Sequence, residues 1–450
     1  MEHQLKKSIL ATSVAVACLL STSANATNGY ASHGFGIIQK AMGGTAVAGS
    51  DNAMNMATNP AALSFGANNW TAGLDIFVPD RGTSYDSPEF NPSISGASLD
   101  GNDDSNFPIP EVAFQKHLND KFSVGIAAYG NGGMNATYDR PIFSQTNNTG
   151  IDFSQLFVAP SVSMKLGEKN SIGASLNLVY QRIKIGGVDS FAPFSSDASN
   201  LSNNGYDGST GAGLSLGWQG QVNDKLTLGL AYRGKTKMSK FDNYSGLLAE
   251  QGRFDIPSMI TAGLSFKATS KTTIALDFAH INYTDVASIS NKNNTAQLQG
   301  QLLQGVAPAD LQGPKLGDDD GAGFGWKDQN IIKLGVKHQL NNRLTLLAGY
   351  NHGKSPIPET ETAFNVLAPA TVEDHITLGM DYKLSKTSNL TFQYMHAFEN
   401  KIKGDGTLTA QGPASPGSII QVGPNPMTDV TAADISMSQN SFGIAYTKNF

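Results

Sequence analysis

Cysteine is nearly absent from this 450-residue sequence, because Cys18 is the only one. It lies in an amino-terminal segment where two lysines precede the apolar run ILATSVAVACLL and the small residues SANA. This order is typical of a secretory signal peptide, with Ala24 and Ala26 in the cleavage pattern. A lipoprotein signal at Cys18 is the alternative, but Ala15 stands where such signals usually carry leucine. We therefore predict a signal peptide over residues 1–26 and a mature chain without disulfide or thiol chemistry.

Apolar runs of membrane-helix length are also missing. The run of the signal segment, from Ile9 to Leu20, is too short for a spanning helix, which needs ~20 residues. No longer run follows, and the mean hydropathy is −0.22. Hydropathy alone would indicate a soluble protein. A membrane β-barrel gives a much weaker signal, however, because only alternate residues of each strand face lipid.

Positive charge is scarce as well. The formal net charge is −6 and becomes −7 without the signal segment, which carries two lysines and one glutamate. An acidic chain binds nucleic acid poorly, because the phosphates repel it. Nucleotide-binding motifs are missing too, so we expect no nucleic-acid partner and no cofactor.

Strand patterns fill the chain from residue 69 onward. Pairs of segments with alternating polarity are joined by tight Asn-, Asp-, Ser- and Lys-rich turns such as LNDK, VNDK and LNNR, and long polar loops separate the pairs. In KLTLGLAYRG the aliphatic and aromatic residues share one face, and Thr, Gly, Ala and Arg share the other. The predicted strands are residues 69–79, 108–118, 121–138, 152–167, 170–186, 211–223, 224–238, 256–268, 271–287, 329–340, 342–354, 373–385, 387–403 and 437–450.

Short connections alternate with long ones along all fourteen predicted strands. This asymmetry is typical of an outer-membrane barrel, whose short turns lie at the periplasmic rim. The sequence therefore predicts an all-β fold: a 14-stranded antiparallel transmembrane β-barrel over residues 69–450, with seven long extracellular loops. The last strand, SFGIAYTKNF, ends on Phe450 like the terminal strands that the barrel assembly machinery reads. Lys448 interrupts its pattern close to the rim, where its ammonium group can snorkel to water.

Residues 27–68 have no strand period and are rich in glycine and alanine. A lumen of fourteen strands is too wide for one layer of small side chains to fill, so we predict that this segment plugs it as a small, partly helical hatch. In the motif Asn59-Pro60-Ala61, the asparagine can cap a short helical turn and proline suits the first helical position. We interpret the motif as the hinge where the hatch ends and the wall begins.

The hatch carries a resemblance to a known family. Its small residues and the Asn-Pro-Ala motif resemble the amino-terminal hatch of the FadL family, outer-membrane transporters of long-chain fatty acids and aromatic hydrocarbons. The resemblance covers the whole chain. The residues that carry it are Gly36, Ala41, Gly44, Ala46, Ala48 and Asp51, followed by Asn59, Pro60 and Ala61.

Membership of this family implies a monomeric barrel in the bacterial outer membrane, in contact with its lipid and lipopolysaccharide. The ligands would be hydrophobic small molecules: fatty acids, aromatic hydrocarbons or alkanes. They would be captured among extracellular loops, bind between hatch and wall, and leave sideways into the membrane through a gap at a kink in the third strand. Transport would be passive and ligand-gated.

The third predicted strand has a candidate for such a gap. Gly130, Gly132 and Gly133 interrupt its alternation, and glycine within a strand marks a bulge or bend. Pro160, in the next strand, lacks a hydrogen-bond donor for the ladder. We predict a gap in the wall near these residues. The alternative is an ordinary barrel corner with a tolerated proline.

Inward-facing residues that depart from the small-residue trend are candidates for a ligand pocket. Phe153 and Phe157 suit an apolar ligand, although both could instead pack on the hatch. Arg233, Lys333 and Lys337 could hold a carboxylate. The alternative is an ion-pair network with the inward acids Asp277 and Asp381, in which Lys337 and Asp277 are the first pair to expect.

The long loops offer two further features. The sequence pattern of residues 294–311 predicts a short helix. This helix could present Leu298, Leu302, Leu303 and Val306 to apolar ligands. Asp318, Asp319 and Asp320 follow, but their spacing is not that of a calcium-binding loop, so we expect a solvated acidic segment and no metal site.

Two other functions remain to be weighed against a transporter. A general or small-solute porin would need an open lumen, which the hatch argues against. A barrel enzyme would need a nucleophile or acid pair beside a histidine, and no Ser or Asp pattern joins the histidines. His338 and His396 even fall on the lipid-facing parity. We therefore expect no enzyme activity.

Overall fold

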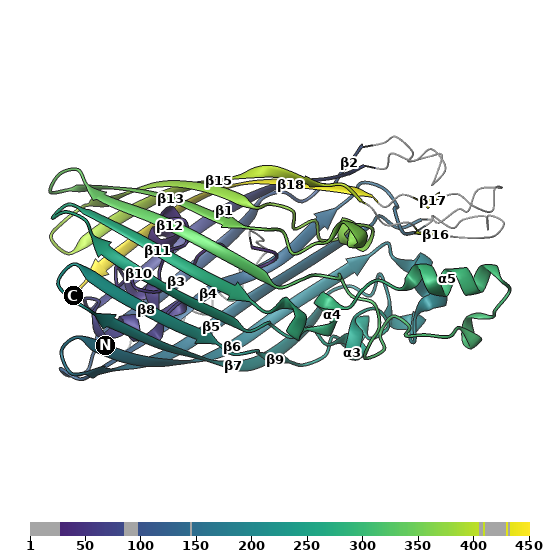
Figure 1. The fold of residues 1–450 in the computed structure, drawn as a ribbon, viewed down its shortest axis with the longest axis horizontal. Helices are drawn as coiled ribbons and strands as arrows, with labels where there is room; N and C mark the ends of the chain where they lie inside the picture. Colours follow the sequence, from purple (N-terminus) through teal and green to yellow (C-terminus); the bar gives the residue numbers. More distant parts are fainter. Residues whose placement is uncertain (1–27, 85–97, 145, 405–407, 410–428, 431–432) are drawn as a thin grey trace, which may run out of the picture.

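The described residues of the computed structural model are 28–84, 98–144, 146–404, 408–409, 429–430 and 433–450. Within them the wall is a closed, antiparallel barrel of fourteen strands, sealed where β18 pairs with β1 (Figure 1). The wall strands are β1 (Asn69–Ser84), β3 (Phe107–His117), β4 (Phe122–Thr137), β5 (Gly150–Leu166), β6 (Asn170–Gly186), β7 (Asp207–Gln221), β8 (Leu226–Arg233), β10 (Met259–Lys267), β11 (Thr272–Ile281), β12 (Gln329–Gln339), β13 (Leu344–Gly353), β14 (Asp374–Lys383), β15 (Ser388–Ile402) and β18 (Asp434–Asn449). The short strands are β2 (Ser98–Asp100), β9 (Lys237–Met238), β16 (Leu408–Thr409) and β17 (Asp429–Val430).

The predicted barrel and its strand number are confirmed, and a few strand ends differ. β1 runs five residues past the predicted end, to Ser84, because β18 pairs with it along its whole length. β11 ends at Ile281 rather than at residue 287, since the 3-10 helix η6 (Tyr283–Asp285) turns the buried Tyr283 into the core. The predicted signal peptide lies outside the described residues and stays a prediction.

The two faces of the wall have opposite chemistry. On β8, Leu230 and Tyr232 are 44% and 47% exposed, whereas Ala231 and Arg233 between and beside them are buried. Large apolar side chains therefore point outward, as a lipid-facing wall requires. Trp70 stands on the outer face near the rim that carries the tight turns. Among the described residues, no helix is long and apolar enough to cross a membrane.

The two rims differ in the same way as the predicted turns and loops. Tight turns and the carboxyl terminus lie at one end, and the long connections with most of the helices lie at the other (Figure 1). Aromatic and aliphatic side chains of these loops form a large buried cluster over the mouth of the barrel. The loop helices are η3 (Asp189–Phe194), η4 (Ala198–Asn200), η5 (Asp242–Tyr244), α3 (Ala249–Gly252), η6, α4 (Ala287–Ser290), α5 (Thr295–Leu303), η7 (Pro308–Asp310), η8 (Glu359–Glu361) and η9 (Phe364–Val366).

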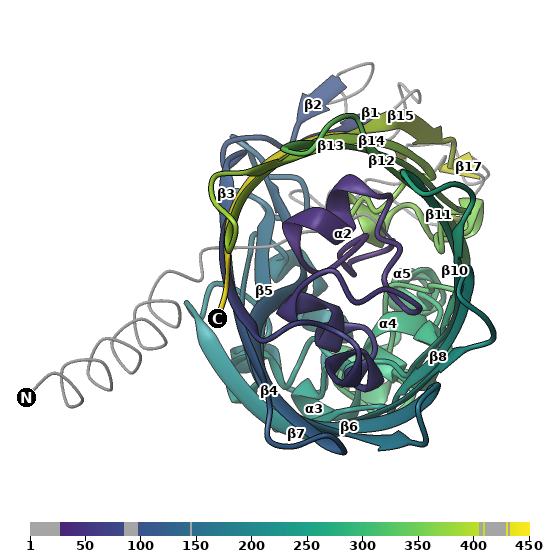
Figure 2. The same ribbon diagram turned by 90° about the vertical axis from the view of Figure 1, so that its left-hand side faces the viewer.

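Residues 28–68 lie inside the ring of strands, as the end-on view shows (Figure 2). This hatch contains α2 (Ile37–Ala41) and the 3-10 helices η1 (Ala53–Ala57) and η2 (Pro60–Ser64). Every residue from 28 to 48 is buried. The small residues of this segment allow its backbone to lie directly against the wall.

Candidate functional site

The Asn-Pro-Ala motif forms the hinge at the end of the hatch. The side chain of Asn59 accepts the Ala61 N–H at 3.0 Å, and Pro60 occupies the first position of η2, as predicted. Asn59 also donates to the carbonyls of Val47, in the hatch, and Trp218, in β7, at 2.7 and 3.0 Å. The motif thus links the hatch to the wall through one hydrogen bond to each.

Glycines of the wall make room for this hinge. A Cβ on Gly217 would stand 1.9 Å from the Asn59 side-chain oxygen, and one on Gly173 would stand 2.4 Å from the Pro60 carbonyl carbon. Both distances are far below van der Waals contact. Glycine is therefore required in β6 and β7 at the level where η2 packs.

Two buried wall carboxylates hold the first helix of the hatch. Glu111 of β3 accepts the Gly36 and Ile37 N–H groups at the start of α2, at 3.1 and 2.8 Å. At the other end of α2, Lys40 donates to Asp75 of β1 at 2.7 Å, with both side chains almost fully buried. Lys40 and Asp75 thus form a buried ion pair, and the Glu111 carboxylate is hydrogen-bonded to the backbone, so each buried ionisable group has a polar partner.

The inward charges of β11 and β12 also bind the hatch. Lys333 donates to the His33 carbonyl at 2.9 Å, and Asp277 accepts the Ala46 and Val47 N–H groups at 2.8 and 3.0 Å. Lys337 forms its ion pair with Asp51 of the hatch.

The predicted pair of Lys337 with Asp277 is therefore wrong. Each of these two charged side chains binds the hatch instead. The alternation of residues along one strand shows which side chains point inward, but it could not show this partner. Asp381 instead accepts hydrogen bonds from Asn389 and Thr391 on the neighbouring strand β15, at 2.6 and 2.8 Å.

Phe153 lines an aromatic cluster around the amino-terminal end of the hatch. Tyr30 stands at its centre, with its ring 6.0 Å from that of Phe153, and packs on three further rings: Phe254, Tyr283 and Trp326. The Tyr283 hydroxyl donates to the Asn28 carbonyl at 2.5 Å. The inward aromatics thus pack on the hatch, and their role in binding ligand stays a prediction.

Phe157 and Arg233 meet near this cluster. The Arg233 guanidinium lies 5.5 Å from the centre of the Phe157 ring, and it also donates to Asn131. Phe157 stacks on Tyr129 with 5.5 Å between ring centres. Arg233 is therefore a buried cation that holds the irregular part of β4 in place.

The glycines of β4 form the predicted irregularity. The pairing of β4 with β5 shifts by one residue between Gly130 and Gly132, which leaves Asn131 as a bulge. The hatch binds here too, because Gly133 donates to the Tyr30 carbonyl and Ser32 to the Asn131 carbonyl, both at 3.0 Å. The amino-terminal end of the hatch therefore covers the bulge from inside.

The break in the ladder beside Pro160 is short, and a longer one lies between β3 and β4. β5 stays paired with β4 across Pro160, opposite Ile126, and its pairing with β6 is missing only at residues 159 and 160. The pairing of β3 with β4, by contrast, stops at Glu111 and Tyr129. Residues 107–110 of β3 and 130–136 of β4 therefore lie side by side without a ladder, up to Thr137, which forms a bridge with Asn102. We call this stretch the window.

Two prolines that the sequence analysis passed over explain the window. β3 pairs with β1 along residues 107–115, and successive residues of an antiparallel strand direct their backbone groups to opposite sides. Because prolines cannot donate, the ladder to β1 must use Phe107, Ile109 and Glu111, so the missing donors of Pro108 and Pro110 face β4. The alternating prolines in the sequence FPIPEV were the signal from which this break in the ladder could have been predicted.

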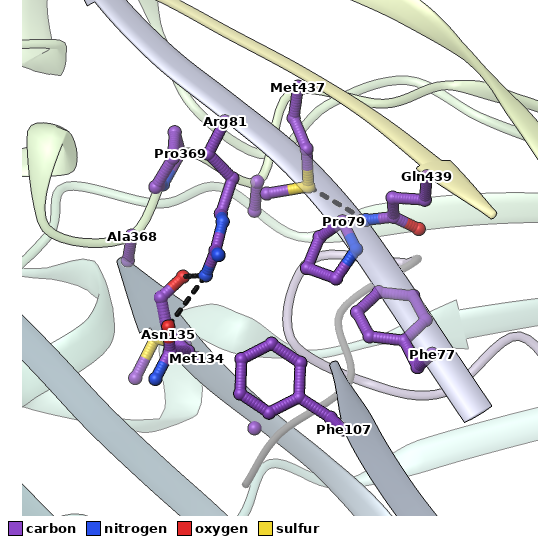
Figure 3. Close-up of a pocket in the computed structure, with 12 residues that line it drawn as sticks. Phe77, Pro79, Arg81, Phe107, Met134, Asn135, Ala368, Pro369, Met437 and Gln439 are labelled. Atoms are coloured by element: carbon purple, nitrogen blue, oxygen red, sulfur yellow. Dashed lines mark hydrogen bonds between the residues drawn. The ribbon is translucent and has the colours of Figure 1, made fainter. Parts of the chain in front are cut away.

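A small cavity lies at the window, beside Gly133, Met134 and Asn135 of β4 (Figure 3). Its volume is about 20 Å³, room for about one water molecule. Most of its lining is apolar, and one guanidinium group, that of Arg81, enters it. The remaining lining residues are Phe77, Pro79, Phe107, Ala368, Pro369, Ala370, Met437 and Gln439.

The predicted loop helix is present as α5, but its surface differs from the prediction. Leu298 is fully buried in the loop cluster, and Leu302 and Val306 pack against that cluster. These residues therefore hold the loops together. The side chain of Leu303 lies outside the described residues.

The loop acids do not gather around a cation. Asp319 and Asp320 are exposed, and among the described residues no three His, Cys, Asp or Glu side chains could hold a metal ion. Hydrogen bonds from Ser199, Asn200 and Ser245 hold the pKa of Asp197 at about 2. That carboxylate thus stays ionised even in acid and links the loop between β6 and β7 to the loop between β8 and β10.

Comparison with known proteins places these features in a family. A family model described as "Outer membrane protein transport protein (OMPP1/FadL/TodX)" matches residues 13–422. No curated protein sequence matches the chain.

Solved structures share the fold. The toluene transporter TodX of P. putida is similar, with 20% identity, a TM-score of 0.62, and coverage of 93% of this chain and 99% of that one. A FadL homologue of Pseudomonas aeruginosa gives 14% identity and a TM-score of 0.66, with coverage of 94% and 100%. The toluene transporter TbuX of Ralstonia pickettii gives 18% identity and a TM-score of 0.60, with coverage of 93% and 99%.

Proposed function

Because the chain belongs to the OMPP1/FadL/TodX family of outer membrane transport proteins, we propose that it takes up hydrophobic compounds by passive diffusion and releases them sideways through its wall. The ligands are long-chain fatty acids or related apolar molecules, such as aromatic hydrocarbons or alkanes. Binding displaces part of the hatch, so the ligand opens its own path.

The observation that carries this proposal is the window. Over this stretch two neighbouring wall strands have no ladder between them, whereas the pairing of β5 with β6 is missing only at residues 159 and 160 of β5. Pro108 and Pro110 remove the donors from one edge, and the bulge at Asn131 makes the other edge irregular. Such a break in a barrel wall supports passage between the lumen and the lipid.

The position of the hatch supports ligand gating. Its first residues lie against the bulge, and Tyr30 fills the centre of the aromatic cluster. A ligand that takes the place of Tyr30 would gain the same apolar contacts and would free the inner side of the window. Ligand binding would then shift the hatch toward an open arrangement.

The other end of the barrel is unsuited to an apolar molecule. A cavity of about 320 Å³ lies near the rim with the tight turns, between hatch and wall. Its lining includes Asp51, Lys271, Lys337, Asp381 and Lys383. A hydrocarbon would lose favourable burial there, whereas sideways exit delivers it to the membrane interior without crossing water.

The alternative functions have less support. A general porin requires an open lumen, but the hatch is bonded to the wall at many points and is largely buried. An enzyme requires assembled catalytic groups. His338, on the outer face, bonds to Thr272, and His396, also on that face, bonds to Asn440.

Uptake by a deletion strain would test the proposal. Cells that carry the wild-type gene are expected to accumulate labelled oleate, toluene or both. Gly132→Val should abolish this uptake, because a Cβ at this position would stand 2.1 Å from the Tyr30 carbonyl oxygen, so the bulge that borders the window could not keep its shape. Gly300→Val is the control, since α5 has open space there. Leakage of small polar solutes through the wild type, without uptake of either ligand, would refute the transporter.

The surroundings of the barrel complete the proposal. We expect a monomer in contact with outer-membrane lipid and lipopolysaccharide. The outer face of β6 supports this contact, because the cationic Arg182 and Lys184 follow Tyr180 beyond the apolar residues of the strand.

Phe450, stacked on Phe114 and 58% exposed, is the residue offered to the barrel assembly machinery. Phe450→Ala should lower the amount of assembled barrel on heat-modifiability gels.

A further inference from the structure

Arg81 crosses the upper part of the window. β3 begins at Phe107, opposite Phe77 of β1, and Arg81 lies four residues further along β1. From there its guanidinium reaches β4, where it donates to the Asn135 carbonyl and, at 2.7 Å, to the Asn135 side-chain oxygen (Figure 3). The same group donates to Asn102 and to the Asp104 carbonyl. This side chain thus joins β1, the loop above the window and β4, below the point where backbone hydrogen bonds link Arg81 to Gly101 and Gly101 to Thr137.

The acceptors of Arg81 are all neutral. The side chain is 1% exposed, and among the described residues no carboxylate lies within ion-pair distance of it. The face of the Phe107 ring, 5.7 Å from the guanidinium carbon, adds a cation–π contact. The carboxylates of Asp80, Asp100 and Asp104 attract the guanidinium from beyond ion-pair distance. A buried cation is costly without a direct partner of opposite charge, and this one faces a cavity lined mainly by apolar side chains.

An anionic head group would be a better acceptor than Asn135. A carboxylate binds guanidinium through two parallel, charge-assisted hydrogen bonds, about twice as strong as neutral ones. Phe77, Met134 and Met437 would surround the first methylene groups of an attached chain. The cavity of about 20 Å³ is too small for such a ligand while Arg81 holds Asn135, so binding and release of β4 must occur together.

We propose that Arg81 is a clasp across the window and that the carboxylate of an amphipathic ligand releases it. The carboxylate replaces Asn135 on the guanidinium, the part of β4 between the bulge and Thr137 separates from β1, and the window opens toward lipid below the backbone bridge between Thr137 and residues 101–103. Arg81 is then the residue that favours apolar acids over uncharged molecules of the same shape. This inference rests on the proposed transport function and names the ligand class of its exit.

Binding of a matched pair of probes tests the clasp. Purified protein in nanodiscs of phosphatidylcholine, which supplies no competing carboxylate, is titrated with oleate and with oleyl alcohol. The wild type should bind oleate about tenfold or more tightly than the alcohol. Arg81→Gln should bring this ratio to about one. Arg140→Gln, which removes an exposed loop arginine paired with Asp139, should leave the ratio unchanged.

A second variant keeps the proposal testable if Arg81→Gln fails to fold. Asn135→Asp keeps the shape and installs a resident counter-ion beside Arg81, so oleate affinity should fall about tenfold while that for the alcohol stays the same. An unchanged ratio in folded Arg81→Gln, or in Asn135→Asp, overturns the clasp. Uptake separates the two proposals: a wild type that transports neither oleate nor toluene refutes the transport function itself.

Discussion

At the scale of single residues, charge inside this barrel serves mainly to hold the hatch. Asp277, Lys333 and Lys337 each bond to hatch residues, and so do Asp75 and Glu111. The alternation of side chains along each strand correctly placed Asp277, Lys333 and Lys337 inside the barrel. It suggested, however, that their partners would be a ligand carboxylate or one another. The hatch takes these charges because its backbone N–H and C=O groups need partners wherever it leaves regular structure.

Replacement of Asp277 tests this anchoring. Asp277→Asn removes a charged acceptor from two backbone N–H groups, so we expect the hatch to loosen and the barrel to lose about 1–3 kcal/mol of unfolding free energy. Guanidinium unfolding in detergent measures the loss. Planar-bilayer recordings should also show more frequent openings. Asp381→Asn is the matched control, because Asp381 bonds only to β15 among the described residues. Equal conductance changes in both variants would contradict the anchoring.

Asn59 offers a second test at this scale. Asn59→Ala removes a helix cap and two donations to backbone carbonyls, one of them on the wall. We expect about 1 kcal/mol or more of lost stability, read as a lower temperature for loss of the heat-modifiable band. The neighbouring, half-buried Thr58 serves as control. If Thr58→Ala lowered that temperature as much as Asn59→Ala, the hinge role would be wrong.

At the scale of elements, β3 and β4 shape the window together. Each is irregular for its own reason: alternating prolines remove donors from one edge, and a glycine-rich bulge bends the other. The glycines of β4 are evident from the sequence, which also suggested Pro160 as the other side of the gap. Pro108 and Pro110, on the opposite side of β4, leave a longer stretch without a ladder.

Restoring the donors of β3 tests the window. In Pro108→Val/Pro110→Val, two new N–H groups point toward β4, so we expect the β3–β4 ladder to extend and uptake of hydrophobic ligands to fall severalfold. Stability should stay the same or rise, because ladder hydrogen bonds are gained. Hydrogen exchange should protect the new amides. Pro160→Val, on β5, is the control and should leave uptake intact. Full uptake by a double variant with protected amides would rule out exit through the window.

At the scale of the whole molecule, barrel and hatch form one interdependent structure. The lumen of fourteen strands needs filling, and the hatch fills it with backbone held close to wall glycines. The loops cover the other end with a buried aromatic cluster, into which Tyr30 of the hatch extends. Removal of the hatch should therefore change permeation far more than it changes the wall.

Deletion of residues 27–57 tests this division of roles. The wall strands pair with each other, so we expect the barrel still to assemble and to stay heat-modifiable. Its single-channel conductance should rise to that of a water-filled pore, and small polar solutes should enter cells. A wild-type-like conductance in an assembled deletion variant would mean that the loops, rather than the hatch, close the lumen.

Much of the architecture follows from the sequence by itself. A period of two with outward aliphatics, together with alternating short and long connections, suffices for the strand number, because lipid imposes that pattern on every strand. The glycine- and alanine-rich segment before the wall indicates a plug. The helix cap formed by Asn59 before Pro60 could also be predicted, because capping involves only neighbouring residues.

Only the tertiary structure decided which groups meet. Lys337 pairs with Asp51, 286 positions away in the chain, and Arg81 reaches Asn135 across a window that exists because β3 ends its pairing early. Such contacts depend on the relative height of strands around a closed barrel and on the path of the hatch inside it. Local patterns fix which face of a strand a side chain occupies, but shear and the hatch determine what that side chain touches.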